Sequence, residues 1–177
     1  MINFDDILIE DFTSSDVVLL MDYYYDSPQE QLEKMSIDRF GMVSRELFSN
    51  SIIQKIENNS TLKESKLDYV KIIYKEKSIG THSVTEITEG QSAVFHAHIW
   101  DKSMQGKGVG RISYVKALNL FFERFNLQQM EFRTPIINIA ANRVKESLGM
   151  NSLGVMDLVE PYLLDGTQAN KYILTKD

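Results

Sequence analysis

The sequence predicts a single mixed α/β domain, of the α+β kind, with a central sheet of about six or seven strands flanked by helices. Helical patterns fill most of residues 13–56, and a two-residue alternation typical of strands begins at residue 69. From residue 93 onward, strand and helix patterns alternate. The 177 residues, of which 43% are hydrophobic and 25% charged, have an ordinary globular composition and can bury one sizeable core.

The N-terminal region is expected to hold one strand followed by three helices. Residues 7–12 are typical of a strand, and the run Thr-Ser-Ser-Asp at 13–16 offers an N-cap for a helix that continues toward Tyr25. A second helix starts at Ser-Pro-Gln-Glu, residues 27–30. A third, over residues 44–56, gathers its apolar side chains on one side.

Three strands joined by tight turns follow. They are predicted at residues 69–75, 80–88 and 93–100, with turns at 76–78 and 89–91. The register of these hairpins decides which side chains share a face of the sheet, because a slip of one residue turns every side chain to the other face.

The last part of the chain alternates between helix and strand. A helix begins near Val109, because apolar side chains recur there every three or four residues and so share one face. These side chains are Val109, Ile112, Val115, Leu118, Phe122 and Phe125. A strand at 129–134 leads to a helix over 138–149, which starts with a capping asparagine and ends with a glycine. Strands at 153–158 and 170–175 complete the pattern.

The most informative motif is the glycine-rich turn Gln-Gly-Lys-Gly-Val-Gly at residues 105–110. It joins a strand to a helix, so that backbone amides and the positive end of the helix dipole can meet an anion. The pattern argues against a P-loop for nucleoside triphosphates, because the residue after Gly110 is Arg111. The alternating glycines also differ from the Gly-x-Gly-x-x-Gly dinucleotide fingerprint. From the hexapeptide alone, a turn that binds nothing remains the alternative.

The three histidines fall on adjacent predicted strands. His96 and His98 are two residues apart, so they share one face of strand 93–100. Whether His82 joins them depends on the hairpin register. Such a group can move protons as a general base, or it can be a set of half-buried structural histidines. A zinc site would need His82 on the same face and further ligands, and we expect no metal.

Charge and composition restrict the partners. The net charge of −6 argues against broad nucleic-acid binding and mildly favours a cationic substrate such as an amine. The sequence has no apolar run of membrane-spanning length and no basic N-terminal segment, so we expect neither a membrane span nor a signal peptide. Because the chain has no cysteine, disulfides and thiolate metal sites are excluded. We therefore expect a cytoplasmic protein.

The glycine turn and the helix after the next strand have counterparts in one enzyme family. Residues 105–110 are similar to the Gln-x-x-Gly-x-Gly signature, and residues 138–150, Asn-Ile-Ala-Ala-Asn-Arg-Val-Lys-Glu-Ser-Leu-Gly-Met, are similar to a second conserved helix. Together they resemble the GNAT superfamily of acyl-coenzyme A dependent N-acetyltransferases, in its RimJ/RimL-like branch. The resemblance covers about residues 92–150 and implies a GNAT-like, largely antiparallel sheet. It also implies that residues 1–65 form a helical substrate-side region and that 92–150 form the cofactor-binding core.

The resemblance implies direct transfer of an acetyl group from acetyl-CoA to a primary amine of a small molecule or of a peptide or protein N-terminus. The backbone at the strand end, the turn amides and the asparagine that opens the next helix would bind coenzyme A. These positions are His98, Ile99, Trp100, Gln105, Gly106, Lys107, Gly108, Val109, Gly110, Arg111 and Asn138. His96, with His98 second, would take the proton of the amine as a base or as part of a water chain.

The chain departs from the family pattern at two positions. Lys145 stands where many GNAT enzymes place a tyrosine that protonates the departing thiolate, and we expect this lysine to be a solvated helix residue. Either the thiolate then leaves without that acid, or Tyr162 or a serine supplies the proton. Ala141 replaces a serine that RimJ/RimL-like proteins often carry, which weakens the case for ribosomal-protein termini as substrates.

Two other functions remain open on the sequence: a non-catalytic acyl-CoA-binding module of GNAT fold, and nucleotide binding by the glycine turn. The apolar strand 171–174 could supply an exposed edge for a homodimer. The tyrosines at 23–25 are expected in the core with one or two exposed hydroxyls. Met35, Asp38 and Arg45 lie in the region that could line the acceptor pocket.

Overall fold

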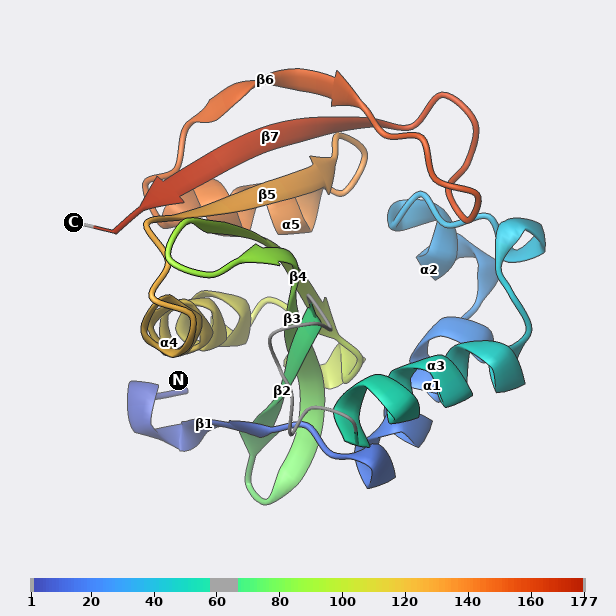
Figure 1. The fold of residues 1–177 in the computed structure, drawn as a ribbon, viewed down its shortest axis with the longest axis horizontal. Coiled ribbons are helices and arrows are strands. Elements are labelled where there is room, and N and C mark those ends of the chain that lie inside the picture. The colour runs from blue at the N-terminus through green and yellow to red at the C-terminus, as the bar shows by residue number, and fades with distance from the viewer. Residues whose placement is uncertain (1, 58–66, 177) are drawn as a thin grey trace. The chain divides into compact units, whose positions relative to one another are not determined.

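The computed structural model describes residues 2–57 and 67–176. In this part of the chain the strands form a seven-stranded sheet in the order β1-β2-β3-β4-β5-β7-β6 (Figure 1). The strands are β1 (Ile7–Asp11), β2 (Leu67–Tyr74), β3 (Lys77–Thr88), β4 (Ser92–Ile99), β5 (Gln129–Pro135), β6 (Ser152–Asp157) and β7 (Gln168–Thr175). The α-helices are α1 (Val17–Tyr25), α2 (Gln29–Lys34), α3 (Arg45–Glu57), α4 (Val109–Arg124) and α5 (Ile139–Ser147).

The predicted fold class is confirmed: a mixed and mostly antiparallel sheet with helices. The pairs β1–β2, β2–β3, β3–β4 and β6–β7 are antiparallel, and β4–β5 is parallel over Ser92–Val94. The chain divides into two compact units, Met1–Phe12 with Thr61–Glu131 and Leu174–Asp177, and Thr13–Ser60 with Phe132–Ile173.

In the first unit, α4 packs on one face of the β1–β4 meander. Its buried side chains follow the helical spacing expected from the sequence, and aromatic rings join the helix to β4. The ring of Phe95 lies 5.0 Å from that of Tyr114 and 6.0 Å from that of Phe121, centroid to centroid. Offset and tilted aromatic pairs of this kind add to the stability that burial itself gives.

The first hairpin turns earlier than the sequence pattern predicts. Its turn is Lys75–Glu76, where both residues have positive φ angles of 48° and 63°, so β3 begins at Lys77 and not at residue 80. Two consecutive left-handed residues give the strand twist that a two-residue hairpin needs. The second turn lies where predicted, with Gly90 at φ 75°.

In the second unit, a short strand pairing joins two loops. Ile37 pairs with Leu163 in an isolated antiparallel bridge, and the N–H of Asp38 donates to the carbonyl of Tyr162 at 2.9 Å. Next to this bridge, Gly41 packs so closely that a Cβ there would lie 1.9 Å from the carbonyl oxygen of Pro161. Only glycine fits at this crossing.

The prediction that residues 171–174 form an exposed edge is wrong. They belong to β7, which lies inside the sheet between β5 and β6, and β6 is the edge strand on that side. The last strand in the sequence folds back between its predecessors, so its apolar side chains are used within the sheet. Ala169 and Tyr172 of β7 are buried accordingly.

Candidate functional site

The glycine turn leads from β4 into α4 through two left-handed glycines. Gly106 has φ 73° and Gly108, the N-cap of α4, has φ 84°. A Cβ at either position would meet no atom within 4 Å, so open space lies directly against the backbone. Glycine is required here for its conformation, and the same lack of a side chain lets a ligand approach the amides. The backbone N–H groups of the first helical turn have no carbonyl acceptor within the helix. They are therefore free of intrahelical bonds and can bind an anion.

Basic side chains flank this turn, while its acidic neighbour serves a structural role. Lys107 and Arg111 are exposed on either side of Gly108. The carboxylate of Asp101 accepts hydrogen bonds from the hydroxyl and the amide of Ser103 at 2.6 and 2.9 Å, which holds its pKa below the usual value. The site thus offers backbone amides and two cations to a phosphate group.

The register of β3 and β4 separates the three histidines. Ser83 lies opposite His96 and Thr81 opposite His98, whereas His82 lies opposite Ala97. Directly opposed residues share a face, so His96 and His98 lie on one face and His82 on the other. The open question from the sequence is therefore answered: His82 does not join the pair.

His96 and His98 are half-buried at the end of β4. The Nε2 atom of His96 lies 2.8 Å from the hydroxyl oxygen of Thr85, which orients the ring. Beyond the pair, the strand end is fixed by Trp100, whose backbone and indole N–H groups donate to the carbonyls of Ile79 and Ser78 at 3.0 and 2.9 Å. No group of three side chains suited to hold a metal occurs within residues 2–57 and 67–176.

The helix α5 begins at the asparagine that the sequence singled out. The side-chain oxygen of Asn138 accepts from the amide of Ala141 at 3.1 Å, as a helix N-cap does. One turn later Asn142 is buried: its side-chain N–H₂ donates to the carbonyls of Pro135 and Asn138, both at 3.0 Å. Its oxygen accepts from the hydroxyl of Tyr172 at 2.8 Å. Asn142 therefore fixes the start of α5, a role that the sequence analysis missed.

Lys145 is not the solvated residue that the sequence analysis predicted. It is only 4% exposed and shares the buried face of α5 with Asn142, one helical turn away. Burial penalises the charged ammonium and lowers the pKa of Lys145 to about 7. This lysine can therefore give up or take a proton near neutral pH.

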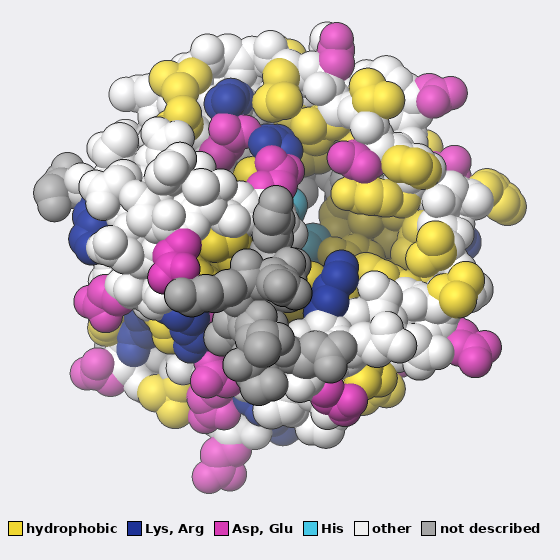
Figure 2. Space-filling model, in the orientation of Figure 1, with side chains coloured by type: hydrophobic (Ala, Val, Ile, Leu, Met, Phe, Trp, Pro, Cys, Tyr) yellow, Lys and Arg dark blue, Asp and Glu magenta, His cyan; other side chains and the backbone are white. Residues whose placement is uncertain are grey.

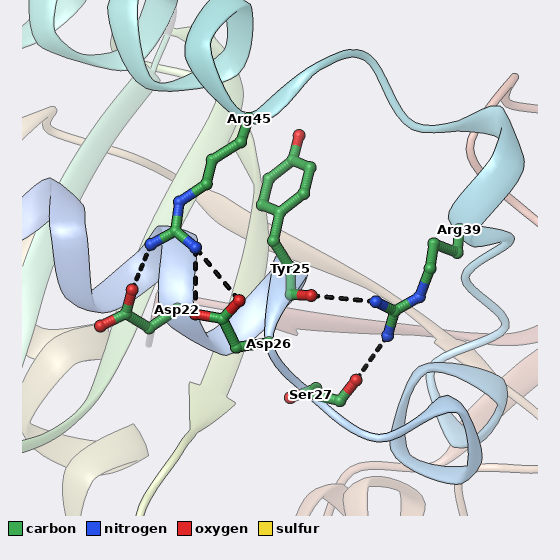
Figure 3. A network of polar contacts seen from close by, with 6 residues as sticks. All are labelled: Asp22, Tyr25, Asp26, Ser27, Arg39 and Arg45. Atoms are coloured by element: carbon green, nitrogen blue, oxygen red, sulfur yellow. Dashed lines mark hydrogen bonds and ion pairs between the residues drawn. The ribbon is translucent and has the colours of Figure 1, made fainter.

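Two arginines of the second unit bind groups at the end of α1 and just after it (Figure 3). The guanidinium of Arg45 on α3 binds the carboxylates of Asp22 and Asp26 at the end of α1, at 3.0 Å for Asp26. Arg39 donates to the backbone carbonyls of Tyr25 and Ser27 at 2.9 and 2.5 Å. The two arginines thus fix the turn that follows α1.

The other residues proposed for this region also have structural partners. Tyr23 is buried and its hydroxyl donates to the sulfur of Met35 at 2.9 Å, while the hydroxyl of Tyr25 donates to the carbonyl of Val43 at 2.8 Å. Asp38 accepts from the amide of Phe40 at 3.0 Å. Of the three tyrosines expected in the core, Tyr23 is buried, whereas Tyr24 and Tyr25 are half-buried.

Hydrophobic side chains gather on one side of the molecular face in Figure 2, over the region around α2 and the loops beside it. Phe40 is 97% exposed, and Val43, Leu47 and Tyr162 are also exposed. Acidic side chains on the described part of this face lie among basic and hydrophobic ones (Figure 2). An exposed apolar surface of this kind often marks a binding region.

Comparison with known proteins identifies the family. Residues 7–151 match the acetyltransferase (GNAT) domain, and the chain belongs to this family. It is an acetyl-CoA dependent N-acetyltransferase, as the resemblance implied. No helix in residues 2–57 and 67–176 combines the length and the apolar character needed to cross a membrane.

Solved structures share the fold at low sequence identity. The ribosomal-protein-S5-alanine acetyltransferase from Vibrio fischeri is 19% identical with a TM-score of 0.76, the match covering 99% of this chain and 96% of that one. RimL, a ribosomal L7/L12 α-N-protein acetyltransferase solved with coenzyme A, is 19% identical with a TM-score of 0.74, covering 96% and 94%. Spermidine N-acetyltransferase SpeG from Vibrio cholerae is 15% identical with a TM-score of 0.73, covering 97% and 94%. Among curated proteins, no sequence matches this chain significantly.

Proposed function

We propose that the chain binds the pyrophosphate of acetyl-CoA on the glycine turn and transfers the acetyl group to a primary amine on a peptide. The observation that carries the cofactor assignment is the open backbone at Gly106 and Gly108, directly before the first turn of α4. The amides of residues 106–111, with Lys107 and Arg111, supply the positive surroundings that a pyrophosphate needs. The pantetheine arm lies along the backbone of residues 98–100, with Asn138 as a further contact.

His96 takes the proton from the attacking amine, directly or through a water chain, and His98 is the second candidate. The amine nitrogen forms a bond to the thioester carbonyl carbon, and the bond from that carbon to sulfur breaks. Thr85 supports this role, because its hydroxyl holds the His96 ring in one orientation.

The departing thiolate takes its proton from Tyr162 or a serine, or leaves without one. Lys145 stands at the sequence position of the family's tyrosine, but its side chain is only 4% exposed.

Two features of the second unit favour a peptide over a polyamine as the acceptor. Asp22 and Asp26, which could attract a polycation, are both bound by Arg45, and the group keeps a single net negative charge. The exposed side chains of Phe40, Val43 and Leu47 offer apolar surface that a peptide can cover. We place the reaction in the cytoplasm, which agrees with a chain that has no cysteine.

A thiol-release assay tests the proposal directly, because the chain has no cysteine and released coenzyme A is the thiol that is measured. A panel should contain peptides with free N-termini, the same peptides with blocked N-termini, small amines and spermidine. We expect turnover on free N-termini above that on spermidine. The reverse order would contradict the peptide assignment, and tight coenzyme A binding with no turnover would favour the non-catalytic acyl-CoA-binding module.

The substitution Gly108→Asp tests the cofactor site. It adds a side chain and a negative charge where the pyrophosphate approaches, at a position with φ 84° that disfavours any side chain. We expect coenzyme A binding to be nearly abolished in a protein that keeps its circular dichroism spectrum. Thermal shifts with coenzyme A, ATP and NAD on the unsubstituted chain provide the control, and stabilisation by a nucleotide alone would point to the nucleotide-binding alternative.

A further inference from the structure

A buried histidine contacts the helix that begins at the glycine turn. His82 in β3 is completely buried, and its Nε2 atom lies 2.9 Å from the hydroxyl oxygen of Ser113 in α4. The imidazole also lies against the rings of Phe95 and Tyr114, at 5.1 Å between centroids in both cases. A side chain enclosed in this way cannot reach a substrate, so any effect on the reaction passes through its neighbours.

Ser113 extends this contact to the turn itself. Its hydroxyl donates to the backbone carbonyl of Gly110 at 3.1 Å. A hydroxyl has one proton to donate, so the Ser113 oxygen accepts from His82 and the imidazole proton is assigned to Nε2. Ser113 is itself completely buried. A path of hydrogen bonds therefore runs from the middle of the sheet to Gly110, within the first turn of α4.

The turn needs such support because of its composition. Gly106, Gly108 and Gly110 have no side chains with which to pack, and a glycine inside a helix lowers its stability by roughly 1 kcal/mol relative to alanine. Val109, which is buried, anchors the turn by packing. Amides that bind an anion are effective when their directions are fixed before the ligand arrives.

We propose that His82 is a positioning residue of the cofactor site. Through Ser113 it fixes the carbonyl of Gly110, and with it the direction of the first-turn amides that meet the pyrophosphate of acetyl-CoA. The inference rests on the proposed function of the glycine turn. It assigns a role to His82, whose place relative to His96 and His98 the sequence left open. His82 lies on the opposite face of the sheet from these two histidines.

The test compares acetyl-CoA with acetylpantetheine, which carries the same thioester but no pyrophosphate. His82→Leu should raise KM for acetyl-CoA and Kd for coenzyme A about tenfold, the effect of losing roughly one buried hydrogen bond, with kcat within about twofold. Its kcat/KM with acetylpantetheine should stay unchanged. His82→Gln, which keeps an N–H near the position of Nε2, should recover most of the affinity for coenzyme A.

Ser113→Ala should reproduce the His82→Leu effect, and the double variant should be no weaker than either single variant, because both substitutions break one path. Arg124→Met is the matched control. It weakens the same helix about 20 Å from the turn, and should lower the melting temperature without changing coenzyme A affinity. If His82→Leu does not fold, the smaller change Ser113→Ala carries the comparison.

Two results would overturn the inference: unchanged coenzyme A affinity in the folded variants, or equal losses with acetyl-CoA and acetylpantetheine. In both cases binding of coenzyme A by the unsubstituted chain leaves the proposed function standing. Failure of the unsubstituted chain to bind coenzyme A overturns the proposed function and this inference together.

Discussion

His96 is held by Thr85 in a way that suits a proton acceptor at the end of β4. If it takes the proton of the amine, His96→Ala should lower turnover by roughly a hundredfold at neutral pH while coenzyme A affinity hardly changes. His98→Ala should do less, because its expected cofactor contact is through the backbone. Stopped-flow thiol release over a range of pH measures both effects.

Thr85→Val is the matched control for the ring's orientation. It removes the hydroxyl but keeps the imidazole, so we expect a loss smaller than that of His96→Ala. Full activity and an unaltered pH profile in the His96 and His98 single variants and in their double variant would make both residues structural.

The lowered pKa of Lys145 predicts that the free energy of unfolding changes with pH in a definite direction. In the folded protein its pKa is about 7, below the ordinary value of 10.5, so between these values the unfolded chain holds the extra proton. The free energy of unfolding should therefore rise with pH across this window, by at most about 1.4 kcal/mol per pH unit, and the penalty is fully present below pH 7. Lys145→Met should remove this slope and stabilise the protein at neutral pH. Urea unfolding at several pH values measures the free energy of unfolding of both proteins. The same pH dependence in the unsubstituted chain and in Lys145→Met would contradict the prediction.

At the scale of elements, salt bridges connect the C-terminal end of α4 to the sheet. The guanidinium of Arg124 binds Asp68 of β2 and Asp11 of β1, both at 2.6 Å. Burial raises the pKa of Asp68, and Arg124 counteracts that shift. Arg124→Met would leave the Asp68 carboxylate buried without this partner, and we expect a loss of roughly 2 kcal/mol in the free energy of unfolding. The double variant with Asp68→Asn should recover part of the loss in urea unfolding, and additive losses would contradict the coupling.

Elements whose signals are local could be predicted from the sequence. The glycines of 105–110 and the capping Asn138 determine where α4 and α5 begin, because positive φ angles and N-caps depend on a few neighbouring residues. The face of the sheet on which a side chain lies, and whether that side chain is buried, depend on distant parts of the chain. The side of the sheet that His82 occupies follows from the β3–β4 register, and the burial of Lys145 follows from packing around α5, neither of which periodicity reveals.

At the scale of the whole molecule, the edge strand β6 is where a second copy could bind. Leu153 and Val155 of this strand are 63% and 57% exposed. We expect a homodimer that buries these two side chains, because an exposed apolar edge favours association. Light scattering should give twice the monomer mass for the natural chain and the monomer mass for the variant with Leu153→Lys and Val155→Lys. A monomer in the natural chain at micromolar concentration would contradict this expectation.

The bridge between Ile37 and Leu163 has an evolutionary consequence. Since Asp38 and Gly41 contact the backbone of Tyr162 and Pro161, neither loop can lengthen or change course alone without losing the pairing. Relatives whose sequences differ in one of these loops should therefore also differ in the other, so that the two segments change together. A chimaera that imports either loop by itself would lose this pairing, whereas one that imports both loops would keep it.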